Sequence, residues 1–315
     1  MIFDVICIGA ALVDMVAHVE RFPEEDDEVF VSNLELLSGG AAANTAYACA
    51  KLALNTAFIG KIGRNDTFGT KIISDFNDIH VNTDLLRYSD NYNTGSAYVA
   101  LSKEGDRRIY AHSGAANYLS KEDINENEIY STKILFLSSL KNLEPFIKAA
   151  EIGKRNNIPV VLNPGMLIIE QGLTNIKELL EKIDILIISL REFQVLFNLT
   201  EKEFNLNKTR EKIGDFFSLG IKVVIITLGK IGALLVTLNS SELIPPFKPD
   251  RVIDTTGAGD AFSAGFIYGF IQDPSFKFEN LRNNAKIGNF IAGKCIEKLG
   301  ARNGIPRVED IKWDN

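Results

Sequence analysis

The chain has 315 residues, of which 46% are hydrophobic and 24% charged, a balance that is typical of a globular protein and excludes intrinsic disorder. With 34 Lys and Arg against 41 Asp and Glu, the net charge is −7 and no basic run is present for nucleic acid to bind. Cys7, Cys49 and Cys295 are widely spaced, so they indicate buried reduced thiols of a cytoplasmic protein. Neither a signal peptide nor a membrane span is expected.

Short β-branched runs alternate with longer amphipathic stretches. The runs predicted as strands are Val5–Ile8, Ala57–Ile62, Ile134–Leu137, Pro159–Leu162, Ile183–Ile188 and Val223–Leu228. The stretches predicted as helices are Ala41–Ala53, Asp66–Ile79, Leu143–Asn156, Asn175–Lys182, Lys208–Leu219, Ala261–Ile271 and Leu281–Leu299. This alternation predicts an α/β fold with a central, mainly parallel sheet and helices on both faces.

Two stretches interrupt this pattern because each predicts a pair of strands with no helix between them. Val16–Glu20 is followed by Glu28–Leu37, and Ser96–Ser102 is followed by Arg107–His112 after a polar turn that contains Gly105. We expect a small sheet from residues 16–38 and 94–113, inserted in a single domain of residues 1–315. Such a sheet can act as a lid over a ligand, and a simple extension of the main sheet is an equal alternative.

The strongest chemical signal is the segment Asp254–Phe262, with the sequence DTTGAGDAF, which leads into an apolar helix. Gly257 and Gly259 let an anion approach main-chain N–H groups at the positive end of that helix. Asp260 falls in the first turn, which is the place for a base that acts on a hydroxyl beside a bound phosphoryl group. An acidic helix cap after a glycine turn is the simpler alternative, but it does not account for the whole string.

Other segments are weaker signals when taken alone. Gly39 and Gly40 precede a helix of small residues that carries Asn44, whose amide can hold a sugar hydroxyl, although close packing is the usual reason for such residues. Asp14 follows the first strand, where open parallel sheets bind ligands, but an Asp there is often only a cap. Thr227–Gly232 predicts a tight turn between strands and is neither a Walker A loop nor a dinucleotide fingerprint.

Together these segments resemble the ribokinase-like (PfkB) sugar and nucleoside kinases over nearly the whole chain. The family's two signatures resemble Gly39–Asn44 and Asp254–Phe262, and its T-L-G-x-x-G turn resembles Thr227–Gly232. His112–Asn117 and Leu162–Pro164 are also similar to family segments. The resemblance implies a Rossmann-like sandwich with a β lid, and a cytoplasmic enzyme that transfers the γ-phosphoryl group of ATP to a primary hydroxyl.

The resemblance also implies roles for individual residues. The catalytic group would be the base Asp260 with the amides of Gly257, Ala258 and Gly259. The acceptor's hydroxyls would be held by Asp14, Gly39, Gly40 and Asn44. The ATP site would be lined by Thr227, Gly229, Gly232, Asn284, Gly288 and Glu192, with Mg²⁺ carried on the phosphates. A monovalent cation, K⁺, would bind Asp254 and Thr256 together with carbonyls of residues 295–304.

Departures from the family pattern bear on the acceptor. Ser189 stands where the family commonly has Asn, three residues before Glu192, and Ala41 stands where ribokinases have Lys. Residues 162–166 lack the Arg that is typical of fructokinases and sugar-acid kinases. The acceptor is therefore expected to be a sugar or, alternatively, a nucleoside of the adenosine, inosine or cytidine type.

Two other classes of protein are less consistent with the sequence than a kinase. A binding protein that has lost turnover is disfavoured by the intact C-terminal signature, and a nicotinamide-dependent oxidoreductase lacks its fingerprint loop. Neither nucleic acid nor a membrane is expected as a partner. Apolar residues of the predicted lid would form a homodimer contact; they are Val29, Phe30, Val31 and Leu34.

Overall fold

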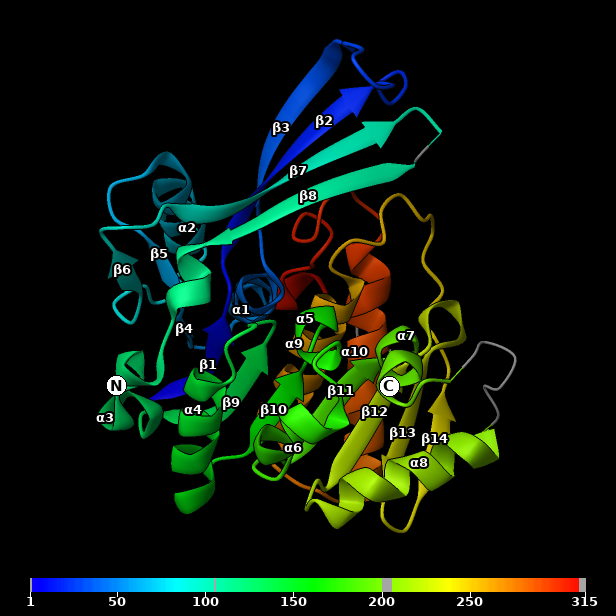
Figure 1. The fold of residues 1–315 in the computed structure, drawn as a ribbon. Helices are drawn as coiled ribbons and strands as arrows, with labels where there is room; N and C mark the ends of the chain where they lie inside the picture. Colours follow the sequence, from blue (N-terminus) through cyan, green and yellow to red (C-terminus); the bar gives the residue numbers. More distant parts are fainter. Residues whose placement is uncertain (1, 105, 200–205, 312–315) are drawn as a thin grey trace.

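A computed structural model describes residues 2–104, 106–199 and 206–311. The strands of its main sheet are β1 (Phe3–Gly9), β4 (Thr56–Ile59), β9 (Thr132–Ser138), β10 (Val160–Asn163), β11 (Ile185–Ser189), β12 (Val223–Thr227), β13 (Ala233–Thr237) and β14 (Ser241–Ile244). Within the described ranges they lie in the order β14-β13-β12-β11-β10-β9-β1-β4 (Figure 1). Among the described strands, β13 pairs antiparallel with both β12 and β14 at one edge, and the other neighbours in this sheet pair parallel. The predicted mainly parallel sheet is confirmed.

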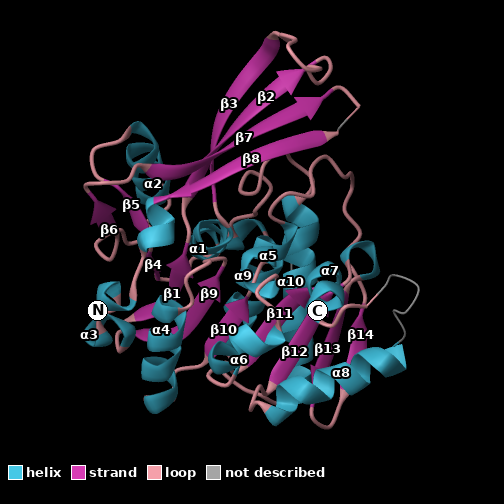
Figure 2. Ribbon diagram, viewed as in Figure 1, coloured by secondary structure: helices cyan, strands magenta, loops and turns pink. Residues whose placement is uncertain are grey.

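Helices cover both faces of this sheet (Figure 2). One face packs against α1 (Ala41–Lys51), α2 (Thr67–Asn77), α9 (Ala258–Gln272) and α10 (Phe278–Cys295). The other packs against α4 (Glu144–Arg155), α5 (Met166–Ile169), α6 (Leu173–Leu180), α7 (Leu190–Leu196) and α8 (Leu206–Ser218), and the short α3 (Glu126–Ile129) precedes β9. In β1, Val5 and Cys7 enter the first core while Ile6 and Ile8 enter the second. Burial of both faces explains why the strands form continuous apolar runs.

A second sheet stands apart from the main one. It consists of β2 (Leu12–Val19), β3 (Val31–Gly39), β7 (Thr94–Ser102) and β8 (Arg107–Gly114), in the order β3-β2-β7-β8. Figure 1 shows it projecting from the carboxyl ends of the main strands, so we call it the projecting sheet, and the alternative of a simple extension of the main sheet is wrong. The predicted turn between β7 and β8 includes Gly105, which lies outside the described residues.

One predicted strand is divided in two. The chain leaves the main sheet after β4, and β5 (Lys61–Gly63) pairs with β6 (Arg87–Ser89) in a separate small sheet. The division falls at Gly60, where a Cβ would lie 2.7 Å from the carbonyl oxygen of Gly9 and 2.4 Å from the ring of Phe58. Only glycine fits this close approach, and the continuous strand predicted over residues 57–62 is therefore wrong.

The register aligns the carboxyl ends of the parallel strands. Gly9 and Asn163 both pair with Ser138, and Ser189 pairs with Thr227. Open α/β sheets bind ligands at this edge. All three cysteines are free and buried, as predicted. In the part of the chain that the structure describes, no helix is both long and apolar enough to cross a membrane.

Candidate active site

The glycine-rich turn before α9 leaves main-chain donors free. Gly257 caps the helix with φ +76°, and a Cβ there would lie 2.5 Å from the Cβ of Ala301. Ala258 donates its N–H to the carbonyl of Thr255 at 3.3 Å. Among the described residues, nothing accepts the N–H groups of Gly257, Gly259 or Asp260. Two of the three amides expected to bind a phosphoryl group are thus available, together with that of Asp260, which the sequence analysis did not include.

Asp260 lies beside these amides and is held from α1. Asn44 Nδ2 donates to Asp260 Oδ2 at 3.0 Å, and Thr45 Oγ1 donates to the Asp260 carbonyl at 3.3 Å. Burial raises the pKa of Asp260 to about 7, against the opposing effects of the Asn44 hydrogen bond and the charge of Arg302, while Glu192 adds to the rise. A carboxylate with a pKa near neutrality is suited to accept a proton from a hydroxyl.

Asp14 comes from the projecting sheet, because β2 begins at Leu12 and not at Val16 as predicted. A Cβ at Gly39 would lie 2.4 Å from Asp14 Oδ2, and a Cβ at Gly40, where φ is +93°, would lie 2.4 Å from the Ala10 carbonyl oxygen. The two glycines therefore allow β3 to pass close to the Asp14 carboxylate. Burial raises the pKa of Asp14 to about 6, although the charge of Arg302 lowers it.

A cavity of about 460 Å³ lies between the projecting sheet and the segment that precedes α9. Its polar lining includes Asp14, Ser38, Arg107, Asp254, Thr255 and Thr256. Its apolar lining from the projecting sheet is Val16, Leu37, Val99, Leu101 and Ile109. Arg107 of β8 crosses to the other side, where its Nη1 donates to Thr256 Oγ1 at 2.7 Å and lies 3.7 Å from Asp254 Oδ1. The projecting sheet thus contacts the residues that lead into the glycine-rich turn before α9.

Asp254 links that turn to the last described segment of the chain. Its Oδ1 accepts the N–H and the hydroxyl of Thr256 at 3.0 and 2.7 Å, and its Oδ2 accepts the N–H of Gly300 at 2.9 Å. Burial acts to raise the pKa of Asp254, but these hydrogen bonds and the charge of Arg107 hold it below the ordinary value. The buried thiol of Cys295 lies 3.7 Å from the Thr256 carbonyl and 3.4 Å from that of Ala301, so both carbonyl oxygens face this thiol.

The other glycine turn follows β12 at the same edge of the sheet. Gly229 and Gly232 have φ of +57° and +104°, and a Cβ at Gly232 would lie 2.1 Å from the Ile244 carbonyl oxygen. In the neighbouring strand, Ser189 caps α7: its Oγ accepts the N–H of Glu192 at 3.2 Å, and Glu192 Oε2 accepts the N–H of Ser189 at 2.8 Å. Ser189, in the place of the family's Asn, therefore serves as a helix cap.

Two residues expected at the nucleotide site lie between helices. A Cβ at Gly288 would meet the ring of Phe262 at 2.9 Å, and Asn284 Oδ1 would lie 2.5 Å from a Cβ at Gly269. Both face α9. Asn289, which the sequence analysis missed, donates its Nδ2 to the Pro245 carbonyl at 2.7 Å, in the segment that contacts Gly232. Nothing in the sequence distinguishes Asn289 from Asn284, because the rotation of α10 about its axis is set by packing.

The comparisons with known proteins agree with this geometry. The family model described as pfkB family carbohydrate kinase matches residues 3–308. The chain is 32% identical over 310 residues to a ribokinase of Staphylococcus aureus, covering 98% of both chains, and 26% identical over 308 residues to a nucleoside kinase of Methanocaldococcus jannaschii, covering 97% and 94%. It superimposes with a TM-score of 0.85 on Arabidopsis thaliana ribokinase in complex with ribose and ATP, at 28% identity and covering 98% and 97% of the two chains.

These observations define a kinase that phosphorylates a hydroxyl group of a sugar or a nucleoside. The chain belongs to the pfkB family of carbohydrate kinases, and its fold is ribokinase-like, as the sequence predicted.

Proposed function

We propose that this chain transfers the γ-phosphoryl group of ATP to a primary hydroxyl of a sugar, with Asp260 as the base. The observation that carries the proposal is the position of this carboxylate, whose pKa is about 7, beside the unpaired N–H groups of Gly257 and Gly259 at the amino end of α9. The pairing suits a reaction in which a hydroxyl must lose a proton while it attacks a bound phosphoryl group.

The acceptor's other hydroxyls would bind in the cavity under the projecting sheet. The Asp14 carboxylate lines this cavity and accepts no hydrogen bond from another described residue. Asn44 orients Asp260, and the amide-lined turn holds the transferring group in line with the attacking oxygen. Arg107 draws β8 toward Thr256, so the projecting sheet acts as a lid that excludes water from the reaction.

The described residues offer main-chain donors that could bind the phosphates of ATP, and magnesium would be bound by those phosphates. The free amides before α9 are suited to bind phosphate oxygens. The Thr227–Gly232 turn, which follows β12 at the same edge of the sheet, would bind the rest of the nucleotide. No group of three or more His, Cys, Asp or Glu side chains in the described ranges could hold a metal ion alone, which fits a magnesium ion carried by the phosphates. When bound, magnesium neutralises charge on the phosphoryl group.

An assay with a panel of acceptors tests the proposal. ATP consumption is coupled to a dye-linked readout with ribose, fructose, adenosine, inosine and cytidine as acceptors, and the phosphorylated product is identified by mass spectrometry. We expect turnover with a sugar, and Asp260→Asn serves as the inactive control. Lack of turnover with every acceptor, at protein concentrations that bind ATP, contradicts the proposal.

A nucleoside acceptor is the second candidate because of one observation. The side of the cavity formed by the projecting sheet is apolar at Val16, Val99, Leu101 and Ile109, and a nucleobase would gain from that contact while a free sugar would not. The panel separates the two candidates, since a nucleoside preference should appear as a lower KM for adenosine, inosine or cytidine than for ribose.

We also propose that K⁺ binds beside the anion-binding turn. The support is the carboxylate of Asp254, whose pKa lies below the ordinary value and which accepts the N–H of Gly300, together with the carbonyl oxygens of Thr256 and Ala301, which both face the Cys295 thiol from the adjoining segments. Turnover in K⁺ should exceed turnover in tetramethylammonium at equal ionic strength. Equal rates contradict this site.

We further propose that the projecting sheet forms the contact of a homodimer. Phe30 is 83% exposed and Leu34 is 56% exposed, and Val31 lies exposed between them, whereas Val29 is partly buried. Exposed apolar side chains of this size favour association. Sedimentation velocity should show a dimer that Leu34→Glu dissociates, and a wild-type monomer at micromolar concentration contradicts the contact.

A further inference from the structure

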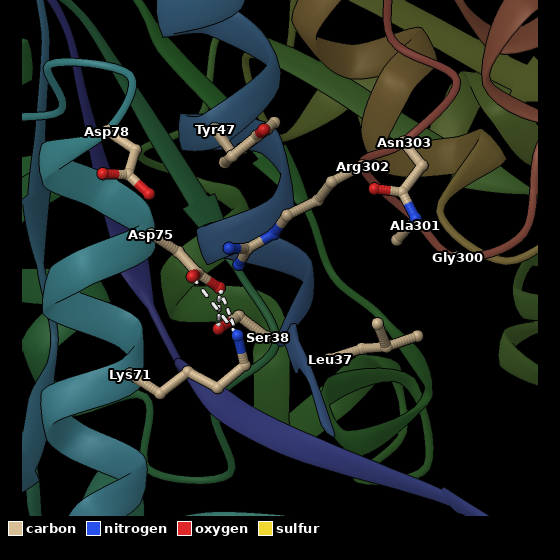
Figure 3. Close-up of a pocket in the computed structure, with 10 residues that line it drawn as sticks. All are labelled: Leu37, Ser38, Tyr47, Lys71, Asp75, Asp78, Gly300, Ala301, Arg302 and Asn303. Carbon is tan, nitrogen blue, oxygen red and sulfur yellow. Dashed lines mark hydrogen bonds and ion pairs between the residues drawn. The ribbon is translucent and has the colours of Figure 1, made fainter. Parts of the chain in front are cut away.

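Arg302 is a buried arginine that is not among the residues proposed to bind the substrates or to act as the base. It lies in the segment after α10 and is 7% exposed. Its guanidinium carbon lies 5.0 Å from the centre of the Tyr47 ring and 5.6 Å from that of Phe76. Figure 3 shows the side chain extending past Tyr47 toward Asp75. Arg302 is one of the residues that line a small cavity of about 240 Å³.

The guanidinium is joined to the proposed base through one side chain. Arg302 Nε donates to Asn44 Oδ1 at 2.9 Å, and Asn44 Nδ2 donates to Asp260 Oδ2 at 3.0 Å. An amide presents an acceptor at one end and donors at the other. If the Asn44 amide were rotated by half a turn, its oxygen would face the carboxylate and its NH₂ group would face the guanidinium. Arg302 thus fixes the orientation in which Asn44 can donate to Asp260.

Hydrogen bonding within the fold does not explain why an arginine occupies this position. Its Nη1 and Nη2 are buried and have no hydrogen-bond partner. The carboxylate of Asp75, toward which they point in Figure 3, accepts instead from Ser38 Oγ at 2.6 Å and from Lys71 Nζ at 3.1 Å. Buried donors without acceptors cost stability. An arginine that contributed only packing between two rings would be better replaced by an apolar side chain.

We propose that Arg302 is a positioning residue, which holds the Asn44 amide so that Asp260 stays oriented as the base and which places a positive charge beside the acceptor-binding carboxylates. This inference rests on the proposed function. The charged groups around the guanidinium are Asp14, Asp75 and Asp260, with the Tyr47 hydroxyl, and the other charged group that acts on Asp260 is Glu192. Removing Arg302 would leave Asp260 with Glu192 as its charged neighbour.

Three variants at two positions test the role. Arg302→Met keeps an unbranched apolar side chain at this position and removes the donor and the charge, whereas Arg302→Lys keeps both. Arg307→Met is the matched control, because Arg307 has a side chain that is 70% exposed and the same charge is lost. We expect Arg302→Met to lower kcat at pH 7 by about 10- to 100-fold, the factor that belongs to a lost hydrogen bond with a charged group. Lys should recover most of it, and Arg307→Met should match wild type.

The pH profile distinguishes positioning from packing. Because the charge of Arg302 lowers the pKa of Asp260, the acid limb of kcat should move to higher pH in Arg302→Met. The affinity for a non-hydrolysable ATP analogue, measured by calorimetry, should stay within about twofold, since the amides before α9 are unchanged. A lower kcat with an unmoved acid limb would indicate lost packing and would overturn the proposal.

A double-mutant cycle with Asn44→Ala tests the route. If Arg302 acts through Asn44, Arg302→Met should lower kcat much less in the Asn44→Ala background, whereas fully additive losses contradict that route. The carboxyl carbon of Asp260, identified by its absence in Asp260→Asn, is also titrated by NMR without substrate. An unchanged Asp260 titration in Arg302→Met refutes the role of Arg302 whether or not the enzyme turns over, and an inactive wild type refutes only the proposed function.

Discussion

Replacing Asp260 with Asn removes the proposed base and leaves its surroundings in place. The new amide oxygen can still accept the Asn44 Nδ2 donor, which lies 3.0 Å from Oδ2 in the present structure. Loss of a general base costs about 10²- to 10⁴-fold in rate, so kcat should fall by at least about 10²-fold. Affinity for ATP should persist, because the N–H groups of Gly257 and Gly259 are unaffected. An Asp260→Asn variant with wild-type kcat would falsify the assignment.

The same substitution should change how the free energy of unfolding depends on pH, because burial raises the pKa of Asp260. This pKa rises from 3.8 to about 7 in the folded protein, so the folded state holds the proton more tightly than the unfolded chain does. Ionisation therefore costs folding free energy as pH rises from about 4 to about 7, and about 3 pKa units correspond to about 4 kcal/mol. Asn pays no such cost. The variant should be no more stable than wild type near pH 4 and more stable by up to about 4 kcal/mol at pH 8.

Urea unfolding at pH 4, 6 and 8 measures this gap. Asp215→Asn, at an exposed position of α8, is the matched control and should show no gap that grows with pH. The activity profile supplies a second check, since wild-type kcat should fall below about pH 7 as Asp260 becomes protonated. A stability gap that is the same at pH 4 and pH 8 refutes the reasoning, because it means that burial does not perturb this carboxyl group.

Three further substitutions test other parts of the site, and Gly214→Ala in α8 serves as the control for the first. Gly259→Ala and Gly214→Ala each place a Cβ in a helix with nothing within 4 Å, so both should stabilise the fold by about 0.5–1 kcal/mol in urea unfolding. Only Gly259→Ala should weaken ATP binding. Equal ATP affinities of the two variants would contradict a phosphate site at Gly259. Asp14→Asn should raise the acceptor KM about tenfold through a lost charge-assisted hydrogen bond, and wild type should show the same rise below about pH 6. Arg107→Gln should raise the acceptor KM about 3- to 10-fold because the contact with Thr256 is lost, and an unchanged KM argues against lid closure through this contact.

Local features of the sequence were sufficient to predict the main sheet and the glycine-rich turn before α9. Residues 5–8, 134–137 and 223–226 are apolar throughout because both faces of their strands are buried. Such strands can be predicted from their own residues, without knowledge of the neighbouring strands. The turn could be predicted because it carries two glycines close together. In the structure Gly257 has a positive φ, and the space beside Gly259 is open. These signals lie within a few residues of one another and do not depend on the rest of the chain.

Features that depend on distant contacts were not predictable. Asn44 and Asp260 are 216 residues apart, and Arg302 lies 258 residues from Asn44, so no local pattern connects them. The helix α10 was predicted, but its orientation was not. Asn284 and Gly288 are four residues apart and share the face that packs on α9, whereas Asn289, about 100° further round the helix than Gly288, donates to the Pro245 carbonyl.

Two costly features of this fold lie where the amino ends of α1 and α9 meet. Asp260 is a carboxylate that loses hydration, and Arg302 has two buried donors without acceptors. Each of these lowers stability, and neither is needed to pack the two helices together. Costs of this kind persist at sites where a ligand or a reaction uses them. Their concentration around one carboxylate is an argument for a site of chemistry there that is independent of any resemblance in sequence.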